Sequence, residues 1–125
     1  MSEKKKILVI DDEEDICYFS KSVLEKTGRF EVWASTDPQA GIKLAKSNKP
    51  DLVVLDINMP LIDGGGVAQS LADFDATKNI PIIFLTALLK KAEIEEDTGK
   101  IAGHFFLAKP VTPKELIDKI DSILI

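Results

Sequence analysis

The sequence predicts an α/β protein in which a parallel sheet lies between two layers of helices. Short apolar runs recur along the 125 residues, and a segment of helical character follows each run. The first, third and fourth runs are continuously apolar instead of alternating, which indicates burial on both faces of a sheet. A chain of this length forms one domain with a sizeable core. The five runs are residues 6–10, 30–34, 51–56, 80–86 and 104–109.

The first two helices are marked by their apolar spacing and by their ends. Gly28 closes the helix predicted over residues 13–27, at a place where a left-handed residue is common. Asp37 stands at the N-cap of the next helix and Pro38 at its first position, where the missing N–H loses no hydrogen bond. The apolar side of the first helix consists of Ile16, Phe19, Val23 and Leu24.

The middle of the chain carries two segments with a less regular pattern. The glycines at 64–66 follow the third strand and predict a short flexible turn. The charged segment "KKAEIEEDTGK" at 90–100 is typical of a helix face in water, which is the favoured interpretation. A surface that docks a partner is the alternative.

The last helix has a complete start signal. Thr112 is the predicted N-cap, Pro113 takes the first position and Glu115 the third, which together form a capping box. We expect no further domain after this helix. Its apolar positions repeat at helical spacing and are Leu116, Ile117, Ile120, Ile123 and Leu124.

Composition narrows the classes of function. The formal net charge is −5, and no stretch concentrates lysine and arginine enough for a nucleic-acid surface, so we expect no direct nucleic-acid binding. A single cysteine, Cys17, excludes an internal disulfide and suits packing on the first helix. No apolar run approaches the roughly 20 residues of a membrane span. We therefore expect a soluble, cytoplasmic protein without a membrane contact.

Polar side chains gather at the ends of four predicted strands. Asp11 and Asp12 follow the first strand, Asp56 ends the third, Thr86 the fourth and Lys109 the fifth. In an open parallel sheet these carboxyl ends share one edge, where ligands bind. We therefore expect a functional site built from four strands.

The charges of this group predict a bound divalent cation. Three aspartates and one lysine leave two negative charges, and neighbouring carboxylates repel one another. Oxygen ligands without histidine or cysteine select a hard ion, and a few carboxylates with open water positions favour Mg²⁺. Such a site suits phosphoryl transfer, with Asp56 as the nucleophile, Lys109 as a neutralising cation and Thr86 as a hydrogen-bond donor.

Four motifs, "VIDDEED", "VLDINMPLIDG", "FLTA" and "FLAKP", follow one another in this order. Together they resemble the receiver domain of two-component response regulators, the CheY-like family, over essentially the whole chain. The resemblance implies a three-layer, flavodoxin-like fold with a five-stranded parallel sheet in the order 2-1-3-4-5. It also implies one receiver domain over residues 1–125, with no output domain in this chain.

The resemblance assigns the acceptor and the metal ligands. Asp56 would accept the phosphoryl group in a Mg²⁺-dependent reaction. Asp12 and Asp56 would bind Mg²⁺ directly, together with the backbone carbonyl of Asn58. Asp11 would act mainly through a bound water.

The resemblance also assigns the residues that respond to phosphorylation. Thr86 would bond the phosphoryl group and Lys109 would pair with it, and the bond from Lys109 to Pro110 would be cis. Phe106 takes the aromatic switch position and, lacking a hydroxyl, would act through packing alone. Phosphorylation would change the surface of the fourth helix, fifth strand and fifth helix.

These implications predict a signalling switch whose own chemistry is limited to self-phosphorylation from small phosphodonors and self-dephosphorylation. The donor would be a histidine kinase, a histidine phosphotransfer protein or a small molecule such as acetyl phosphate. The target would be a downstream protein or an output domain outside this chain. We expect a monomer, with dimerisation as an option after phosphorylation.

Two other functions are weighed against this one. A phosphatase of the haloacid dehalogenase type also uses a strand-end aspartate, but it places a second aspartate two residues later, where this chain has Asn58. A degenerate receiver that serves only as a binding module would be expected to have lost Asp56, one of the acidic pair or Lys109. All of these are present.

Overall fold

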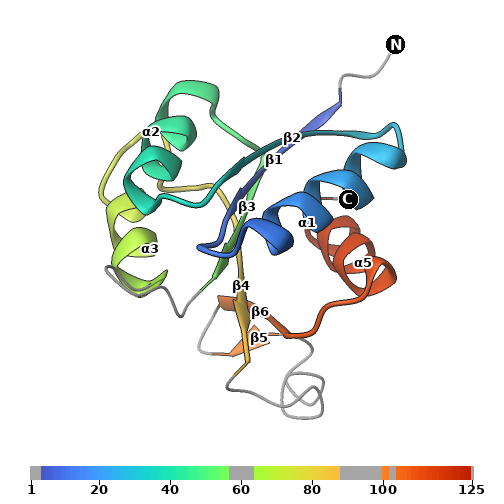
Figure 1. The fold of residues 1–125 in the computed structure, drawn as a ribbon. Coiled ribbons are helices and arrows are strands. Elements are labelled where there is room, and N and C mark those ends of the chain that lie inside the picture. The colour runs from blue at the N-terminus through green and yellow to red at the C-terminus, as the bar shows by residue number, and fades with distance from the viewer. Residues whose placement is uncertain (1–3, 57–63, 88–99, 102–103, 125) are drawn as a thin grey trace.

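The computed structural model describes residues 4–56, 64–87, 100–101 and 104–124, and it shows strands and helices in alternation (Figure 1). Asn58 and most of the charged segment 90–100 lie outside these ranges. The strands are β1 (Lys5–Ile10), β2 (Phe30–Ser35), β3 (Leu52–Asp56), β4 (Ile82–Thr86), β5 (Lys100–Ile101) and β6 (His104–Ala108). The helices are α1 (Glu14–Lys26), α2 (Pro38–Asn48), α3 (Gly64–Ala72) and α5 (Pro113–Leu124).

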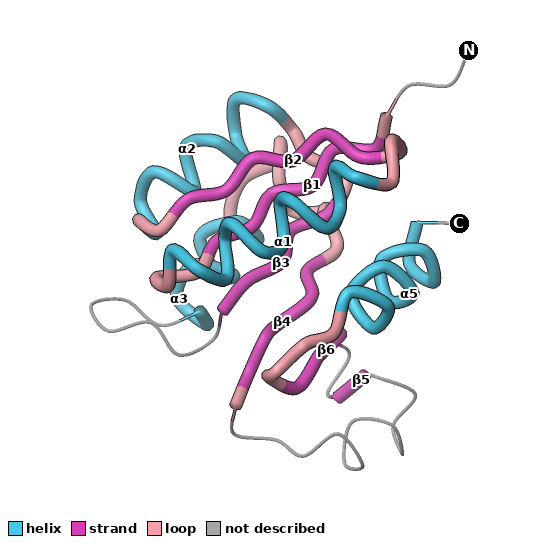
Figure 2. Tube along the Cα trace, turned by 45° about the vertical axis from the view of Figure 1, so that its right-hand side comes forward, coloured by secondary structure: helices cyan, strands magenta, loops and turns pink. Residues whose placement is uncertain are grey.

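The sheet has the predicted order, with one addition. Its strands follow the order β2-β1-β3-β4-β6-β5. The pairs from β2 to β6 are all parallel, so the five-stranded order 2-1-3-4-5 is confirmed with β6 as the fifth strand (Figure 2). The two-residue β5 pairs antiparallel with β6 at the edge and was not predicted. Two residues are too few to carry a readable hydrophobic pattern.

Alternation along the strands produces the two cores of the predicted three-layer fold. Val9 and Val54 belong to the core that α1 and α5 cover. Leu8 and Leu55, one residue away on each strand, belong to the core that α2 and α3 cover. Figure 1 shows these two pairs of helices on opposite faces of the sheet.

The helix ends follow the local signals in the sequence. Asp37 Oδ1 accepts from Gln39 N at 3.1 Å, as an N-cap does. Thr112 Oγ1 accepts from Glu115 N at 3.2 Å while Glu115 Oε1 accepts from Thr112 N at 3.0 Å, which completes the capping box. Gly28 has a φ of 75°, as a left-handed helix terminus requires. Among the described helices, none has the length and apolar character needed to cross a bilayer.

The prediction of a flexible turn at 64–66 is wrong, because α3 begins at Gly64. Each glycine disfavours a helix by about 1 kcal/mol relative to alanine. Burial of Val67 and Leu71, 0% and 1% exposed, contributes about 1.5–3 kcal/mol per side chain. Thr77 also donates its hydroxyl to the carbonyl of Leu71 near the end of the helix. Tertiary packing therefore outweighs the weak local propensity.

Gly41 lets α2 approach β1 closely. A Cβ at this position would lie 2.7 Å from both Cδ1 and Cγ1 of the buried Ile10. We expect Gly41→Ala to lower the free energy of unfolding by about 1–2 kcal/mol, because overpacking outweighs the gain in helix propensity. Urea denaturation measures this loss. Ile10→Val removes Cδ1 and should recover part of it in the double variant; a stabilised Gly41→Ala protein would contradict the prediction.

Candidate functional site

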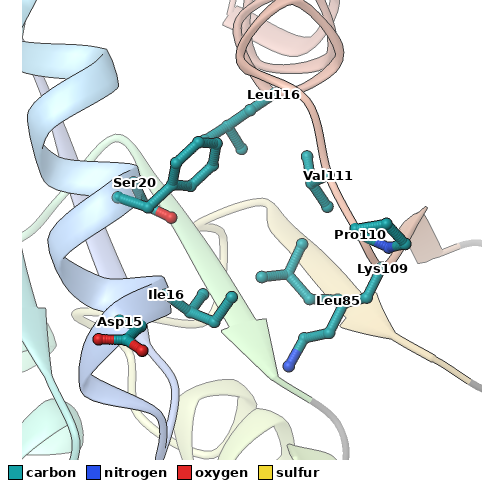
Figure 3. Close-up of a pocket in the computed structure, with 9 residues that line it drawn as sticks. Asp15, Ile16, Ser20, Leu85, Lys109, Pro110, Val111 and Leu116 are labelled. Carbon is teal, nitrogen blue, oxygen red and sulfur yellow. The ribbon is translucent and has the colours of Figure 1, made fainter.

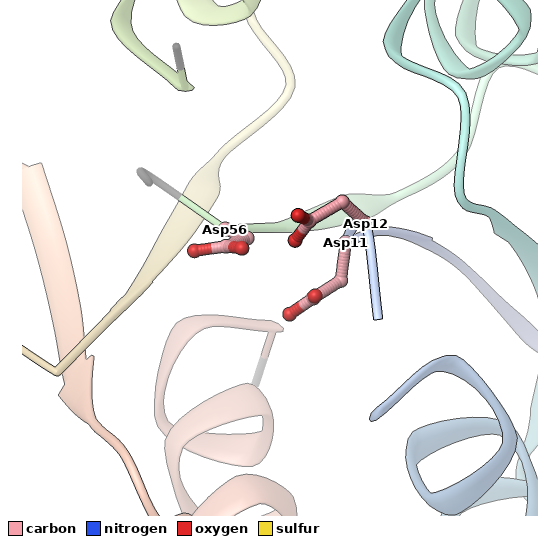
Figure 4. Close-up of side chains that lie close together, drawn as sticks. All are labelled: Asp11, Asp12 and Asp56. Atoms are coloured by element: carbon pink, nitrogen blue, oxygen red, sulfur yellow. The ribbon is translucent and has the colours of Figure 1, made fainter. Parts of the chain in front are cut away.

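Three carboxylates meet where β1 and β3 end. These parallel neighbours pair Ile10 with Leu55, so Asp11 and Asp56 come next on adjacent strands. Asp11 is 0% exposed and Asp56 is 2% exposed, whereas Asp12 is exposed. One carboxylate oxygen from each residue lies within 4.8 Å of the others. Figure 4 shows the three side chains converging from the two strand ends.

Lys109 brings a positive charge to the carboxylates from the end of β6. Its Nζ lies 3.2 Å from Asp11 Oδ2, 3.5 Å from Asp56 Oδ2 and 3.4 Å from Glu13 Oε1. Its backbone N–H donates to the carbonyl of Thr86 at 2.8 Å, which joins the ends of β4 and β6. The peptide bond from Lys109 to Pro110 is cis, as the family resemblance implied.

Thr86 and Phe106 occupy different places. Thr86 is buried and follows Leu85, the partner of Asp56 in the β3–β4 pair, so it reaches the same edge as the carboxylates. Phe106 lies two residues before the end of β6 and stacks on Phe84, with ring centroids 5.3 Å apart. The structure therefore places Phe106, on β6, against the core that α2 and α3 cover.

Five predicted site residues thus share one edge, as the strand-end argument required: Asp11, Asp12, Asp56, Thr86 and Lys109. Phe106 is close in sequence to that edge but outside the carboxylate cluster, and the carbonyl of Asn58 lies outside the described residues. Glu13, the third carboxylate partner of Lys109, was not among the predicted site residues. Its place in "DDEED" beside two predicted ligands was the available signal.

The site is electrostatically strained by its excess of carboxylates. Burial raises the pKa of Asp11 to about 6, and the charge of Asp56 adds to this, while a hydrogen bond from Glu13 N opposes it. Desolvation, followed by the interaction with Asp56, raises the pKa of Asp12. Burial lowers the pKa of Lys109, but the charges of the surrounding carboxylates outweigh burial and raise it overall.

The donor set fits a hard cation. Within the described residues, Asp11 Oδ2 is buried and has no hydrogen-bond partner, although the ammonium of Lys109 lies 3.2 Å away. An unsatisfied buried carboxylate oxygen is costly and is commonly explained by an ion or a water. The neighbouring ligand atoms are also carboxylate oxygens. Mg²⁺ binds oxygen ligands, whereas softer metals favour nitrogen or sulfur. The residues present therefore fit a magnesium ion.

An apolar pocket adjoins this site on the side of α1 and α5. It has a volume of about 290 Å³ and opens between α1 and the connection from β6 to α5 (Figure 3). Lys109 lines the pocket and also reaches the carboxylates with its ammonium group. The other lining residues are Asp15, Ile16, Phe19, Ser20, Leu85, Pro110, Val111 and Leu116.

Comparison with known proteins identifies the family. The family model described as the response regulator receiver domain matches residues 7–121. The chain belongs to this family. The receiver domain is 36% identical to the alkaline phosphatase synthesis transcriptional regulatory protein PhoP of Bacillus subtilis, over 96% of this chain and 48% of that protein. It is 40% identical to the probable transcriptional regulator ycf27 of Cyanophora paradoxa, over 97% of this chain and 48% of that protein.

Solved structures agree on the fold. The chemotaxis protein CheY4 of Vibrio cholerae superposes with a TM-score of 0.83 at 24% identity, covering 98% of this receiver domain and 100% of that chain. The receiver domain spans about half the length of the curated relatives that it matches. The predicted family and its role as a phosphorylation-activated signalling switch are confirmed, and these comparisons give no support to a haloacid dehalogenase phosphatase or a degenerate binding module.

Proposed function

We propose that Asp56 of this receiver domain accepts a phosphoryl group from a histidine kinase or a histidine phosphotransfer protein in a Mg²⁺-dependent reaction. One observation carries the proposal. The Asp56 carboxylate is fixed at the end of a fully buried strand, within 4.8 Å of two other carboxylates and 3.5 Å from a lysine ammonium. A fixed nucleophile beside charges that neutralise phosphoryl oxygens is what phosphoryl transfer needs.

The residues divide the work of the transfer. An oxygen of Asp56 attacks the phosphorus atom, and the donor's imidazole nitrogen, or the acetate oxygen of acetyl phosphate, leaves with the bonding electron pair. The ammonium of Lys109 and the hydroxyl of Thr86 stabilise the phosphoryl oxygens. Asp12 and Asp56, with the carbonyl of Asn58, would hold Mg²⁺, and Asp11 would act through a bound water; the ion would supply further charge neutralisation.

The output follows from changes around Thr86. A phosphoryl group on Asp56 draws the Thr86 hydroxyl toward it, and Phe106 repacks beside Phe84 on the neighbouring strand. This alters the surface around β6, α5 and the fourth helix that the family resemblance implies, and a downstream protein or an output domain recognises that surface. We place residues 1–125 in the cytoplasm as a single receiver domain that is monomeric until phosphorylated and makes no direct contact with nucleic acid or membrane.

Incubation with acetyl phosphate and Mg²⁺, followed by intact-mass measurement, tests the proposal. We expect one phosphoryl group per chain, no adduct when a chelator removes Mg²⁺, and slow loss of the adduct afterwards. Rapid release of phosphate over many turnovers would favour a phosphatase. No adduct under any condition would favour a binding module and would contradict the proposal.

The apolar pocket predicts a difference between protein donors and small donors. A protein must bring its phosphohistidine to the edge that carries Asp56, and Ile16 lines the pocket beside that edge. We expect Ile16→Ser to slow phosphoryl transfer from a phosphorylated phosphotransfer protein by about five-fold, or about 1 kcal/mol. The rate of phosphorylation by acetyl phosphate should not change. Tyr18→Ser is the matched control, since Tyr18 is 77% exposed on the same helix and does not line the pocket. Equal slowing with both donors would contradict this use of the pocket.

A further inference from the structure

Glu13 occupies the N-cap position of α1 without acting as a cap. Its backbone is extended, with φ −93° and ψ 118°, yet its side chain makes no hydrogen bond to the first turn of the helix. N-caps are normally serine, threonine, aspartate or asparagine, whose short side chains accept from the first N–H groups. Glutamate therefore gives α1 a poorer start than this position could provide. A local departure of this kind is typical of a functional position.

Both the backbone and the side chain of Glu13 serve the acidic site instead. Its N–H donates to Asp11 Oδ1 at 2.9 Å. Its Oε1 accepts from Lys109 Nζ at 3.4 Å, across a separation of 96 residues. The residue that begins α1 is thus connected to the buried carboxylate and to the only lysine within ion-pair distance of that carboxylate in the described chain.

The three carboxylates around Lys109 are not equivalent. An ammonium has three N–H donors, and the oxygens of Asp11, Glu13 and Asp56 lie 3.2, 3.4 and 3.5 Å from it. The side chains of Asp11 and Asp56 are 0% and 3% exposed, whereas that of Glu13 is 60% exposed. An exposed ion pair changes folding equilibria by about five-fold at most. Glu13 therefore contributes little to holding the site together, and it is the one exposed carboxylate of the three around the ammonium.

We propose that Glu13 is a positioning residue that restrains Lys109 and thereby slows phosphorylation of Asp56, an inference that rests on the proposed phosphoacceptor role of Asp56. While Glu13 engages the ammonium, Lys109 is only partly available to the incoming phosphoryl oxygens. Loss of the Glu13 charge frees Lys109 to neutralise them. The restraint acts through Lys109 and involves no contact between Glu13 and the phosphoryl group.

Glu13→Gln tests the restraint, because glutamine keeps the shape of the side chain and removes its charge. We expect phosphorylation by acetyl phosphate with Mg²⁺ to be about three- to five-fold faster in Glu13→Gln, within the limit set by an exposed ion pair. Glu14→Gln is the matched control: Glu14 is also exposed and acidic, begins the same helix and makes no ion pair with Lys109. It should change the rate less than about two-fold. Equal acceleration in both variants would show general charge repulsion of the donor and would overturn the proposal.

A second measurement does not depend on phosphorylation. Urea unfolding of Glu13→Gln, Lys109→Gln and the double variant gives the coupling between the two side chains. We expect a coupling of about two- to five-fold in the unfolding equilibrium constant, screened by salt. Absence of coupling between Glu13 and Lys109 would contradict the proposed restraint. A wild-type protein that shows this coupling but forms no phosphoryl adduct would refute the proposed function of Asp56 while leaving the Glu13–Lys109 pair established.

Discussion

Asp56→Asn is expected to form no phosphoryl adduct with acetyl phosphate and Mg²⁺, a loss of at least about a thousand-fold in rate. An amide has neither the charge nor the nucleophilic oxygen of a carboxylate. No other carboxylate can move into the place of Asp56 as the nucleophile, because Asp56 is 2% exposed and its neighbour Asp11 is 0% exposed. Rigid placement makes this a single-residue function.

Intact-mass measurement with Asp75→Asn as the control decides the assignment. The Asp75 side chain is 97% exposed, so Asp75→Asn should acquire one phosphoryl group as the wild type does. Cooperative urea unfolding of Asp56→Asn shows that the fold is intact. A full adduct on Asp56→Asn would move the acceptor to another residue and would contradict the proposed mechanism.

The site was largely predictable because a parallel sheet brings its strand ends together. The strands at 6–10 and 51–56, read as buried, placed Asp11 and Asp56 at one edge of the sheet, and the strand order implied by the family resemblance put them on adjacent strands. The pairing of Ile10 with Leu55 agrees with this. The placement of Lys109 at the same edge required only that the last strand be assigned correctly. The prediction depended on topology and the end of each strand, which apolar runs mark clearly.

The features that sequence analysis missed depend on tertiary contacts. The helix that begins at Gly64 is stabilised by burial of Val67 and Leu71, which local propensity does not report. The contact between Glu13 and Lys109 spans 96 residues. The position of Glu13 beside Asp11 and Asp12 could mark the residue, but no local pattern names its partner. Contacts between residues far apart in sequence, and helices with weak local propensity, could therefore not be predicted from the sequence.

Asp12→Ala should largely remove the stabilisation of the fold by Mg²⁺. In a chelating buffer the variant is expected to be at least as stable as the wild type, because one oxygen of Asp12 lies within 4.8 Å of an oxygen of Asp11 and of Asp56, and these carboxylates repel one another. With Mg²⁺ at about ten times the wild-type dissociation constant, the wild type should gain about 1.4 kcal/mol. The variant, which lacks a direct ligand and should bind at least ten-fold more weakly, should gain no more than about 0.4 kcal/mol.

Isothermal titration calorimetry measures the affinity for Mg²⁺ directly, and we expect this affinity to fall at least about ten-fold in Asp12→Ala. Asp15→Ala is the matched control, because it removes one exposed aspartate charge a few residues away on α1 without touching the cluster. If both variants lost affinity equally, general charge would explain binding. If Asp12→Ala bound Mg²⁺ as the wild type does, the strand-end carboxylates would not be its ligands. Only a specific loss, joined to the opposite stability shifts in chelator and Mg²⁺, makes repulsion between the carboxylates the cause of cation binding.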